Sequence, residues 1–195
     1  STGNKEVKSR LDYMISELAL CQEKDGTGYV GGIPEGKVFW DRIHKGDIDG
    51  SGFGLNNTWV PIYNIHKLFA GLIDAYNYTG NEKAKEIVIK LGDWFIELIR
   101  PLSDEQIQKI LKTEHGGINE SFADLYSITK NKKYLETAEK LSQKAILDPL
   151  IKKEDKLTGL HANTQIPKVI GFEKIGKLSD NKQWSDAAQF FWMNV

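Results

Sequence analysis

The sequence predicts an all-α protein built from helical hairpins, and two observations support this prediction. The first is a pattern of residues that recurs along the chain at an interval of about 50 residues. It comprises Asp74, Tyr76, Thr79 and Asn81, then Asp124, Tyr126, Thr129 and Asn131, and then Ser179 and Asn181. The second is that apolar residues around these copies follow the period of an α-helix. Self-similarity at a fixed interval is typical of stacked helical repeats.

We expect the helices at the following places along the chain. An amphipathic helix over 5–22 precedes a hairpin of 61–78 and 82–99, after which Ser103 caps a short helix. A second hairpin comprises 117–128 and 133–146, and a polar connector over 152–157 leads to a third hairpin of 162–178 and 183–195. Cys21 lies on the apolar side of the first helix, so we expect it to be a small buried hydrophobe.

The segment 25–57 interrupts this helical pattern. It holds half of the 18 glycines, with Tyr29, Phe39, Trp40 and Phe53 among them. Connections between bundle helices are usually much shorter, and disordered segments are poor in aromatic residues. We therefore expect an ordered loop over one end of the helices, either functional or a surface elaboration. The stretch DIDGSG at 47–52 resembles the start of a calcium loop, but the bidentate glutamate is missing, which argues against calcium.

Composition limits the classes of partner and site. The 195 residues are 40% apolar and 27% charged, which suits one domain with a core. The net charge of −1 and the lack of a basic stripe make nucleic acid and membrane surfaces unexpected partners. No apolar run approaches the roughly 20 residues that span a bilayer. With a single cysteine, no disulfide and no cysteine-rich metal site is expected, and we expect neither metal nor cofactor in this chain.

Three of the four histidines begin the first helix of a hairpin. They are His66, His115 and His161, at the same register of successive repeats. When hairpins stack, these positions converge at one end of the structure and suggest a pocket. Each histidine alone would more simply be a helix-terminal side chain that bonds to backbone, and only the shared register favours the pocket. The interval does not bring three ligands to within about 2 Å of one ion, so a metal site does not follow.

The residues next to these histidines are amides, carboxylates and aromatic rings. We predict a substrate-binding set that adds Trp59, Tyr63, Glu114, Asn119, Glu120 and Asn163 to the three histidines. Rings that stack on a sugar face, together with forked donors and acceptors for its hydroxyls, are typical of a carbohydrate site. Peptide or cofactor binding stays open as an alternative. No nucleophile-elbow, phosphate-loop or zinc-protease motif is present.

Four long segments carry a resemblance to a known family. They read GYVGGIPEGKVFWDRIHKGDI, WVPIYNIHKLFAGLIDAY, TEHGGINESFADLYSITKNKKYLETA and LTGLHANTQIPKVIGF. Together they resemble glycoside hydrolase family 127, a bacterial family with family 146 as a near relative. The resemblance covers nearly the whole chain. It implies an (α/α)6 toroid with β-L-arabinofuranosidase activity, of which 1–195 would form about half, with β-sandwich domains after it.

The resemblance also implies an unusual chemistry. In the family a zinc-bound cysteine is the nucleophile of a retaining reaction, and a separate glutamate is the acid/base. Neither the zinc ligands nor these two residues occur in this chain, so no catalytic residue is expected in it and zinc is implied only for the full-length protein. His66, His115 and His161 match histidines that line the family's arabinofuranose pocket. The other six site residues rest on their proximity to these three.

The expected function is therefore that of a glycosidase fragment which binds the substrate and pairs with the remainder of its own barrel. Two alternatives stay open: a catalytically silent helical-repeat or carbohydrate-binding module, and a family member with another glycoside specificity. The fragment would be inactive alone and would expose apolar helix faces at Val7 to Leu18, at Ala187 to Phe191 and at Trp192. The compartment is unknown, and a plant-glycan hydrolase favours an extracellular or periplasmic location.

Overall fold

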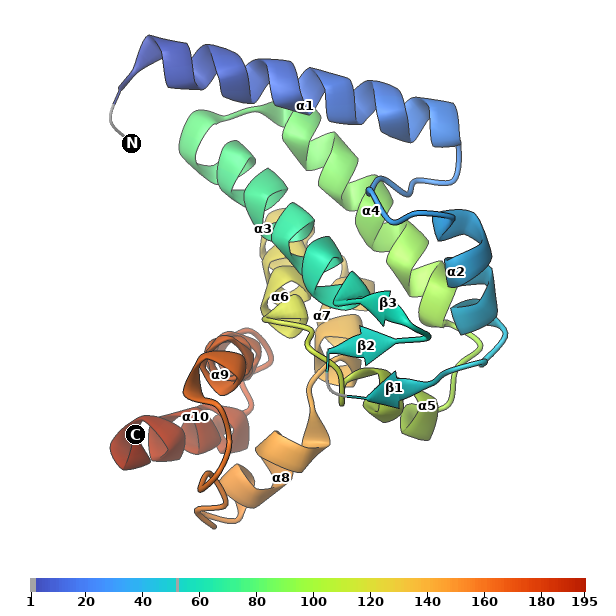
Figure 1. Cartoon of the computed structure of the whole chain (residues 1–195). Helices are drawn as coiled ribbons and strands as arrows, with labels where there is room; N and C mark the ends of the chain where they lie inside the picture. Colours follow the sequence, from blue (N-terminus) through green and yellow to red (C-terminus); the bar gives the residue numbers. More distant parts are fainter. Residues whose placement is uncertain (1–2, 52) are drawn as a thin grey trace.

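The computed structural model describes residues 3–51 and 53–195 and confirms the predicted all-α hairpin fold (Figure 1). In the described residues the helices are α1 (Lys5–Asp25), α2 (Gly36–His44), α3 (Pro61–Thr79), α4 (Glu82–Ile99), α5 (Asp104–Ile110), α6 (Ile118–Thr129), α7 (Lys132–Lys140), α8 (Lys144–Ile151), α9 (Ala162–Leu178) and α10 (Lys182–Asn194). Three short strands, β1 (Gly50–Ser51), β2 (Gly54–Leu55) and β3 (Thr58–Trp59), form an antiparallel sheet in this order.

The recurring sequence pattern is the chemistry of the turns within the hairpins. Thr79, Thr129 and Ser179 each donate a hydroxyl hydrogen bond to the carbonyl four residues earlier, at 2.5, 2.7 and 2.8 Å. Asn81 and Asn181 then cap the following helices, because their side-chain oxygens accept backbone N–H groups of the first turn at 3.0 and 3.1 Å. These turns make α3 with α4, α6 with α7, and α9 with α10 into hairpins whose helices pack on each other.

An aromatic cluster joins the first two hairpins. The ring of Phe122 on α6 lies 5.1 Å from Phe69 on α3 and 5.5 Å from Phe95 on α4, measured between centroids. Tyr134 on α7 closes the cluster at 6.4 Å from Phe122, and all four side chains are buried. A separate apolar cluster, which includes Phe172 and Phe191, holds α8, α9 and α10 together. The third hairpin therefore has its own core and meets the rest mainly where α9 packs on α6.

The segment 25–57 is ordered, but it is not a loop throughout. It contains α2, β1 and β2, which lie near the start of α3 and the end of α4 (Figure 1). On α2 the side chains of Phe39, Trp40 and Ile43 are buried, whereas the neighbouring Val38 is exposed. The helix was missed because nine residues between glycine-rich flanks give too short a window for a periodic signal. The stretch 47–52 is partly β-strand, and its residue 52 lies outside the described residues.

Three further expectations need correction. Cys21 is exposed rather than buried, because α1 fully buries only Ile15 and Gln22. The helix expected over 133–146 is two helices, since α7 ends at Lys140 and α8 begins after its cap residue Gln143. The apolar face expected to be open at Ala187 and Phe191 is buried against α8 and α9, although Trp192 is exposed. On the α1 face expected to be open, Val7 and Met14 are exposed as predicted, whereas Leu11 and Leu18 pack against the core.

We predict that Phe122→Ala lowers the free energy of unfolding by about 3–5 kcal/mol, since it opens a cavity between α3, α4, α6 and α7. Urea unfolding followed by circular dichroism measures this change. Tyr78→Ala is the matched control, because Tyr78 is an exposed aromatic residue on α3, and its effect should stay within about 0.5 kcal/mol. Equal losses for the two variants would contradict the assigned core.

Candidate functional site

The beginnings of α3, α6 and α9 meet at one place in the molecule. His66 lies in the second turn of α3, and His115 lies in the short segment 111–117 that precedes α6. His161 is the residue before α9. The three histidines lie near the starts of their helices but not at one register, because His66 lies inside α3 whereas His115 and His161 precede α6 and α9. Their side chains also differ, since His66 and His115 are buried and His161 is exposed.

The close approach of His66 to the next hairpin depends on two glycines. The imidazole Nδ1 of His66 accepts the backbone N–H of Gly117 at 3.3 Å. Gly116 has a left-handed φ of 58°, and a Cβ on this residue would collide with the same imidazole nitrogen. A Cβ on Gly117 would lie 3.2 Å from the carbonyl oxygen of Pro167 on α9 and 3.4 Å from His66. Only glycine lets the three helix starts come this close without strain.

Hydrogen bonds assign a different tautomer to each buried histidine. The Nδ1 of His115 lies 2.8 Å from the carbonyl oxygen of Thr113, which can only accept, so this nitrogen carries the proton and Nε2 is left as an acceptor. In His66 the situation is reversed. Its Nδ1 accepts from Gly117, so a neutral His66 carries its proton on Nε2 and presents a donor. The pair thus offers one donor and one acceptor nitrogen.

Both imidazoles are uncharged at neutral pH. Burial, followed by the nearby Lys67, lowers the pKa of His66 to about 4. Burial also lowers the pKa of His115 to about 3, with a smaller contribution from the charge of Lys168. His115 directly precedes Gly116, whose backbone packs against the imidazole of His66, so the two histidines lie close together. Neutral rings with fixed tautomers can serve as hydrogen-bonding groups of fixed sense.

A buried lysine stands next to this pair and was missed by sequence reasoning. Lys168 on α9 is 4% exposed, and its Nζ donates to the side-chain oxygens of Gln143 and Gln165 at 2.8 and 3.0 Å. Burial lowers its pKa to about 8, while the carboxylate of Glu114 acts in the opposite sense. In the sequence Lys168 stands between apolar residues of an amphipathic helix. Lys168 follows Gln165 by three residues and so shares its helix face, which was the available signal.

Glu114 ties the histidine segment to α9. One carboxylate oxygen accepts the backbone N–H of Gly116 at 3.2 Å, and the other accepts the hydroxyl of Thr164 at 3.1 Å. Thr164 lies in the first turn of α9, so this contact fixes the start of that helix over the histidine pair. Glu114 is half-buried and uses both oxygens within the protein. It therefore belongs to the site as a residue that positions His115 and α9.

Two other predicted residues connect helices. Asn119 is buried and donates to the carbonyl oxygen of Lys168 at 3.0 Å, while its side-chain oxygen has no protein partner among the described residues. Glu120 accepts from Lys174 of α9 at 3.0 Å, and Asp124 accepts from the same lysine at 2.8 Å. Both residues lie between α6 and α9, and their contacts explain why the two hairpins stay together.

The remaining predicted residues form the outer part of the site. The ring of Tyr63 lies 6.1 Å from the imidazole of His66, measured between centroids. The Nζ of Lys67 lies over the same Tyr63 ring, 4.9 Å from its centroid. Trp59 is 70% exposed and stacks with Phe53 at 5.2 Å. Asn163 is exposed at the start of α9, like His161. The structure thus brings His66, His115, Glu114 and Tyr63 together, and it leaves Trp59, His161 and Asn163 exposed.

The described residues do not fit a zinc centre. Among them no three histidine, cysteine or acidic side chains lie together in a way that could hold a metal ion. The only cysteine is exposed on α1. No metal-dependent step is therefore derived from this chain. In the described part of the chain no helix has the length and apolar character that a membrane crossing requires.

Comparison with known families gives one match. A model of the β-L-arabinofuranosidase GH127 catalytic domain matches residues 1–195. No curated protein sequence matches the chain significantly.

We predict that the free energy of unfolding falls as the pH decreases from about 6.5 towards 4. The two histidines have lowered pKa values in the folded chain, so the unfolded chain binds more protons below its histidine pKa of 6.5. Each histidine should contribute a loss of roughly 1–2 kcal/mol at pH 5 relative to pH 7.5, measured by urea unfolding.

The control for this prediction is a variant that lacks one of the two titrating groups. His66→Gln should be less stable than the parent at pH 7.5, and it should lose less stability on acidification. Imidazole nitrogen chemical shifts measured by NMR give an independent readout of the neutral rings. A parent chain whose stability is the same at pH 7.5 and pH 5 would contradict the assignment.

Proposed function

Because the chain belongs to the family of β-L-arabinofuranosidase GH127 catalytic domains, we propose that its buried histidine pair binds the sugar of a β-L-arabinofuranoside. The observation that carries this proposal is the opposite hydrogen-bonding sense of two adjacent neutral rings. His66 presents a donor nitrogen and His115 an acceptor nitrogen. A sugar hydroxyl is both an acceptor and a donor, so two such nitrogens can fix the hydroxyls of one ring in a defined orientation.

The surroundings of the pair support a neutral, polar ligand. Burial removes water, so a hydrogen bond formed here is worth more than one at the surface. Tyr63 lies beside His66 and supplies an aromatic face. Lys168 acts on the electrostatics of His115, and Glu114 on those of Lys168, while their own polar atoms bond to protein groups. The charged groups therefore keep the site rigid, and the neutral ones remain for the substrate.

We further propose that this chain supplies the binding part of an (α/α)6 barrel, with the nucleophile, the acid/base and the zinc site of a retaining mechanism outside it. Two open apolar regions support this reading. One is formed by Val7 and Met14 on α1, and the other by Trp192 and Met193 on α10. A cavity of about 590 Å³ between α1 and the first turns of α3, lined by Leu18, Ile65 and Leu68, is a suitable place for another helix.

A second candidate function is that of a carbohydrate-binding module without catalysis. The observation that favours it is that, in the part of the chain that the structure describes, no cysteine lies beside the histidine pair, since Cys21 is on α1. Hydrolysis of a β-L-arabinofuranoside by a protein that contains this chain decides between the two. An extracellular or periplasmic location would suit either function, because plant glycans are polymers.

We predict that methyl β-L-arabinofuranoside binds to the chain and that His66→Phe and His115→Phe each weaken binding by about tenfold or more. Each variant removes one hydrogen bond and leaves a hydroxyl of the ligand unpaired in a buried site. Titration followed by NMR measures the affinity. His161→Phe is the matched control, because His161 also lies near the start of a hairpin but has an exposed side chain, and its effect should stay within about threefold.

Circular dichroism and urea unfolding show whether the variants fold. For a variant that fails to fold, His66→Gln or His115→Gln replaces the phenylalanine substitution. Binding that is unaffected in folded variants of both buried histidines would overturn the proposed site. Binding of the methyl glycoside without any hydrolysis in the presence of the remaining domain would favour the non-catalytic alternative.

A further inference from the structure

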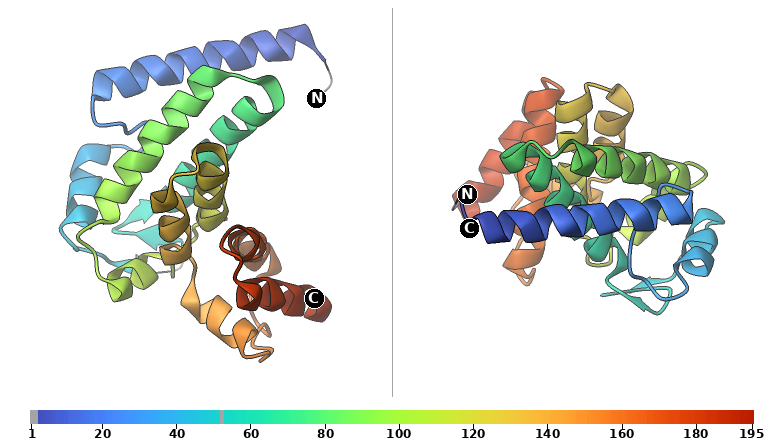
Figure 2. Two further views of the ribbon diagram at one scale, coloured as in Figure 1. Left: turned by 180° about the vertical axis from the view of Figure 1, so that it is seen from behind. Right: turned by 90° about the horizontal axis from the view of Figure 1, so that it is seen from above.

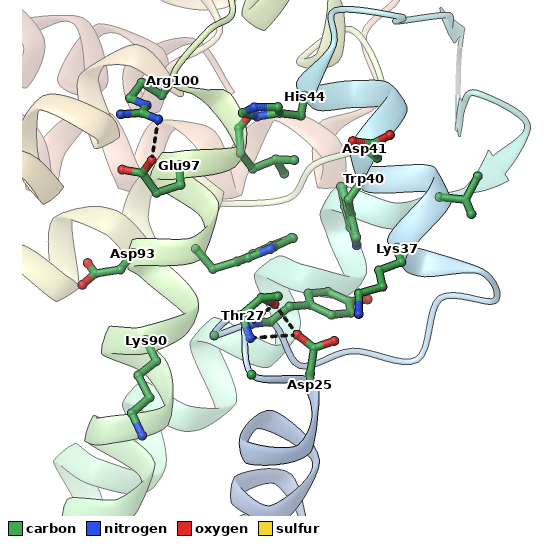
Figure 3. Close-up of a pocket in the computed structure, with 16 residues that line it drawn as sticks. Asp25, Thr27, Lys37, Trp40, Asp41, His44, Lys90, Asp93, Glu97 and Arg100 are labelled. Atoms are coloured by element: carbon green, nitrogen blue, oxygen red, sulfur yellow. Dashed lines mark hydrogen bonds and ion pairs between the residues drawn. The ribbon is translucent and has the colours of Figure 1, made fainter.

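A second cleft lies between α2 and α4 (Figure 3). The ribbon views place α9 on the other side of the α3–α4 hairpin (Figures 1 and 2). The cleft has a volume of about 1040 Å³ and lies between α2, the second half of α4 and the turn 25–29. This volume is at the upper end of the range of about 300–1,000 Å³ that is usual for small-ligand sites. Trp59, Tyr63, His66, His115 and His161 do not line it. The cleft is therefore separate from the histidine pair.

The turn at the end of the cleft is held firmly against α4. Gln22 is buried, and its amide nitrogen donates to the carbonyl oxygens of Gly28 and Ile87 at 2.8 and 3.0 Å. Gly28 has a left-handed φ of 93°, and a Cβ on it would lie 2.8 Å from the carbonyl oxygen of Lys90. On the opposite side, His44 lies 3.0 Å from the carbonyl oxygen of Leu98 through its Nδ1 and joins α2 to α4. The walls of the cleft are thus fixed by hydrogen bonds.

Three aromatic rings from three different elements form the apolar part of the cleft. The centroid of Trp94 on α4 lies 4.7 Å from that of Tyr29 and 5.3 Å from that of Trp40 on α2, the latter edge-on. Trp40 is buried, and its indole N–H has no acceptor among the described residues. A ligand hydroxyl or an ordered water is the kind of acceptor that it lacks. Trp94 and Tyr29 are half-buried and remain accessible.

The carboxylates around these rings already have cationic partners. Asp41 pairs with Lys45 at 2.6 Å, Glu97 pairs with Arg100 at 3.0 Å, and Asp93 pairs with Lys133 at 2.7 Å. Asp25 accepts from Thr27 within the turn, and the ammonium groups of Lys37 and Lys90 add two further donors (Figure 3). The lining therefore contains both signs of charge in near balance, which suits a neutral ligand with many hydroxyl groups better than an ion.

We propose that this cleft is a second carbohydrate site, which binds two or more units of a neutral oligosaccharide away from the histidine pair. Its aromatic rings stack on the apolar faces of the sugar rings, and the charged side chains of α2 and α4 bond to the hydroxyls. The identity of the ligand as a glycan rests on the proposed function. In that setting the second site would hold a polymeric substrate near the enzyme and raise its local concentration.

NMR titration of the five tryptophan indole N–H signals tests this proposal, with neutral arabino-, xylo- and galacto-oligosaccharides of three to six units as probes. Occupation of the cleft shifts the signals of Trp40 and Trp94. Occupation of the histidine pair shifts the imidazole nitrogen signals of His66 and His115 and leaves these two indole signals unchanged. Single substitutions of each tryptophan by phenylalanine assign the signals. The two proposals therefore succeed or fail on different signals.

Two variants of the cleft and one control complete the design. Trp94→Ala should weaken the binding seen at Trp40 by about tenfold, because stacking carries much of the affinity in aromatic sugar sites. The double substitution Lys37→Ala with Asp41→Ala removes only exposed side chains of α2, so it tests the cleft should Trp94→Ala fail to fold. Glu86→Ala, an exposed residue of α4 that does not line the cleft, should leave binding unchanged.

Three outcomes would overturn the proposal. The first is that no probe at millimolar concentration shifts the signals of Trp40 and Trp94. The second is that the cleft variants and Glu86→Ala bind equally well. The third is that both indole signals, in a longer protein that contains this chain, are already protected from solvent and insensitive to sugar, because another part of the polypeptide then fills the cleft.

Discussion

The contact between His66 and the backbone of Gly116 and Gly117 is the constraint on which the site depends. It fixes α3 to the start of α6, and the same glycines leave room for the carbonyl of Pro167 on α9. Three helix starts can meet only because two successive residues have no Cβ. The contact also sets the tautomer of His66, since the nitrogen that accepts from Gly117 cannot carry the proton. The same hydrogen bond therefore fixes the packing of α3 on the start of α6 and the proton position of His66.

Much of the hairpin architecture could be predicted because the signals that define it are local. The threonine and asparagine residues of each turn act on backbone groups within four positions of themselves, as the bonds of Thr79 and Asn81 show. The sequence alone is then enough to find them. The approximate place of each histidine near the start of a hairpin follows from the same repeat. Its exact position and its burial depend on tertiary contacts, so His66 lies buried inside α3 whereas His161 is exposed before α9.

The features that were missed are those in which tertiary contacts override local signals. Helix α2 is short, lies between glycine-rich segments, and is stabilised by burying Trp40 and Ile43. Cys21 sits at an apolar position of α1, but that helix buries only Ile15 and Gln22 fully, so Cys21 stays exposed. Lys168 looks like a surface residue in sequence. Its burial is possible because two glutamines accept hydrogen bonds from its ammonium group. They are Gln143, the residue before α8, and Gln165 on α9.

Burial of Lys168 has a cost that the surrounding structure offsets. An ammonium group taken out of water is unfavourable, and the side-chain oxygens of Gln143 and Gln165 replace its hydration, while Glu114 supplies an opposite charge nearby. The same positive charge disfavours protonation of His115 and so helps to keep that ring an acceptor. A glutamine at position 168 would keep some hydrogen bonds but remove this charge. The lysine therefore acts on the site through the charge state of its neighbour, without any contact to a ligand.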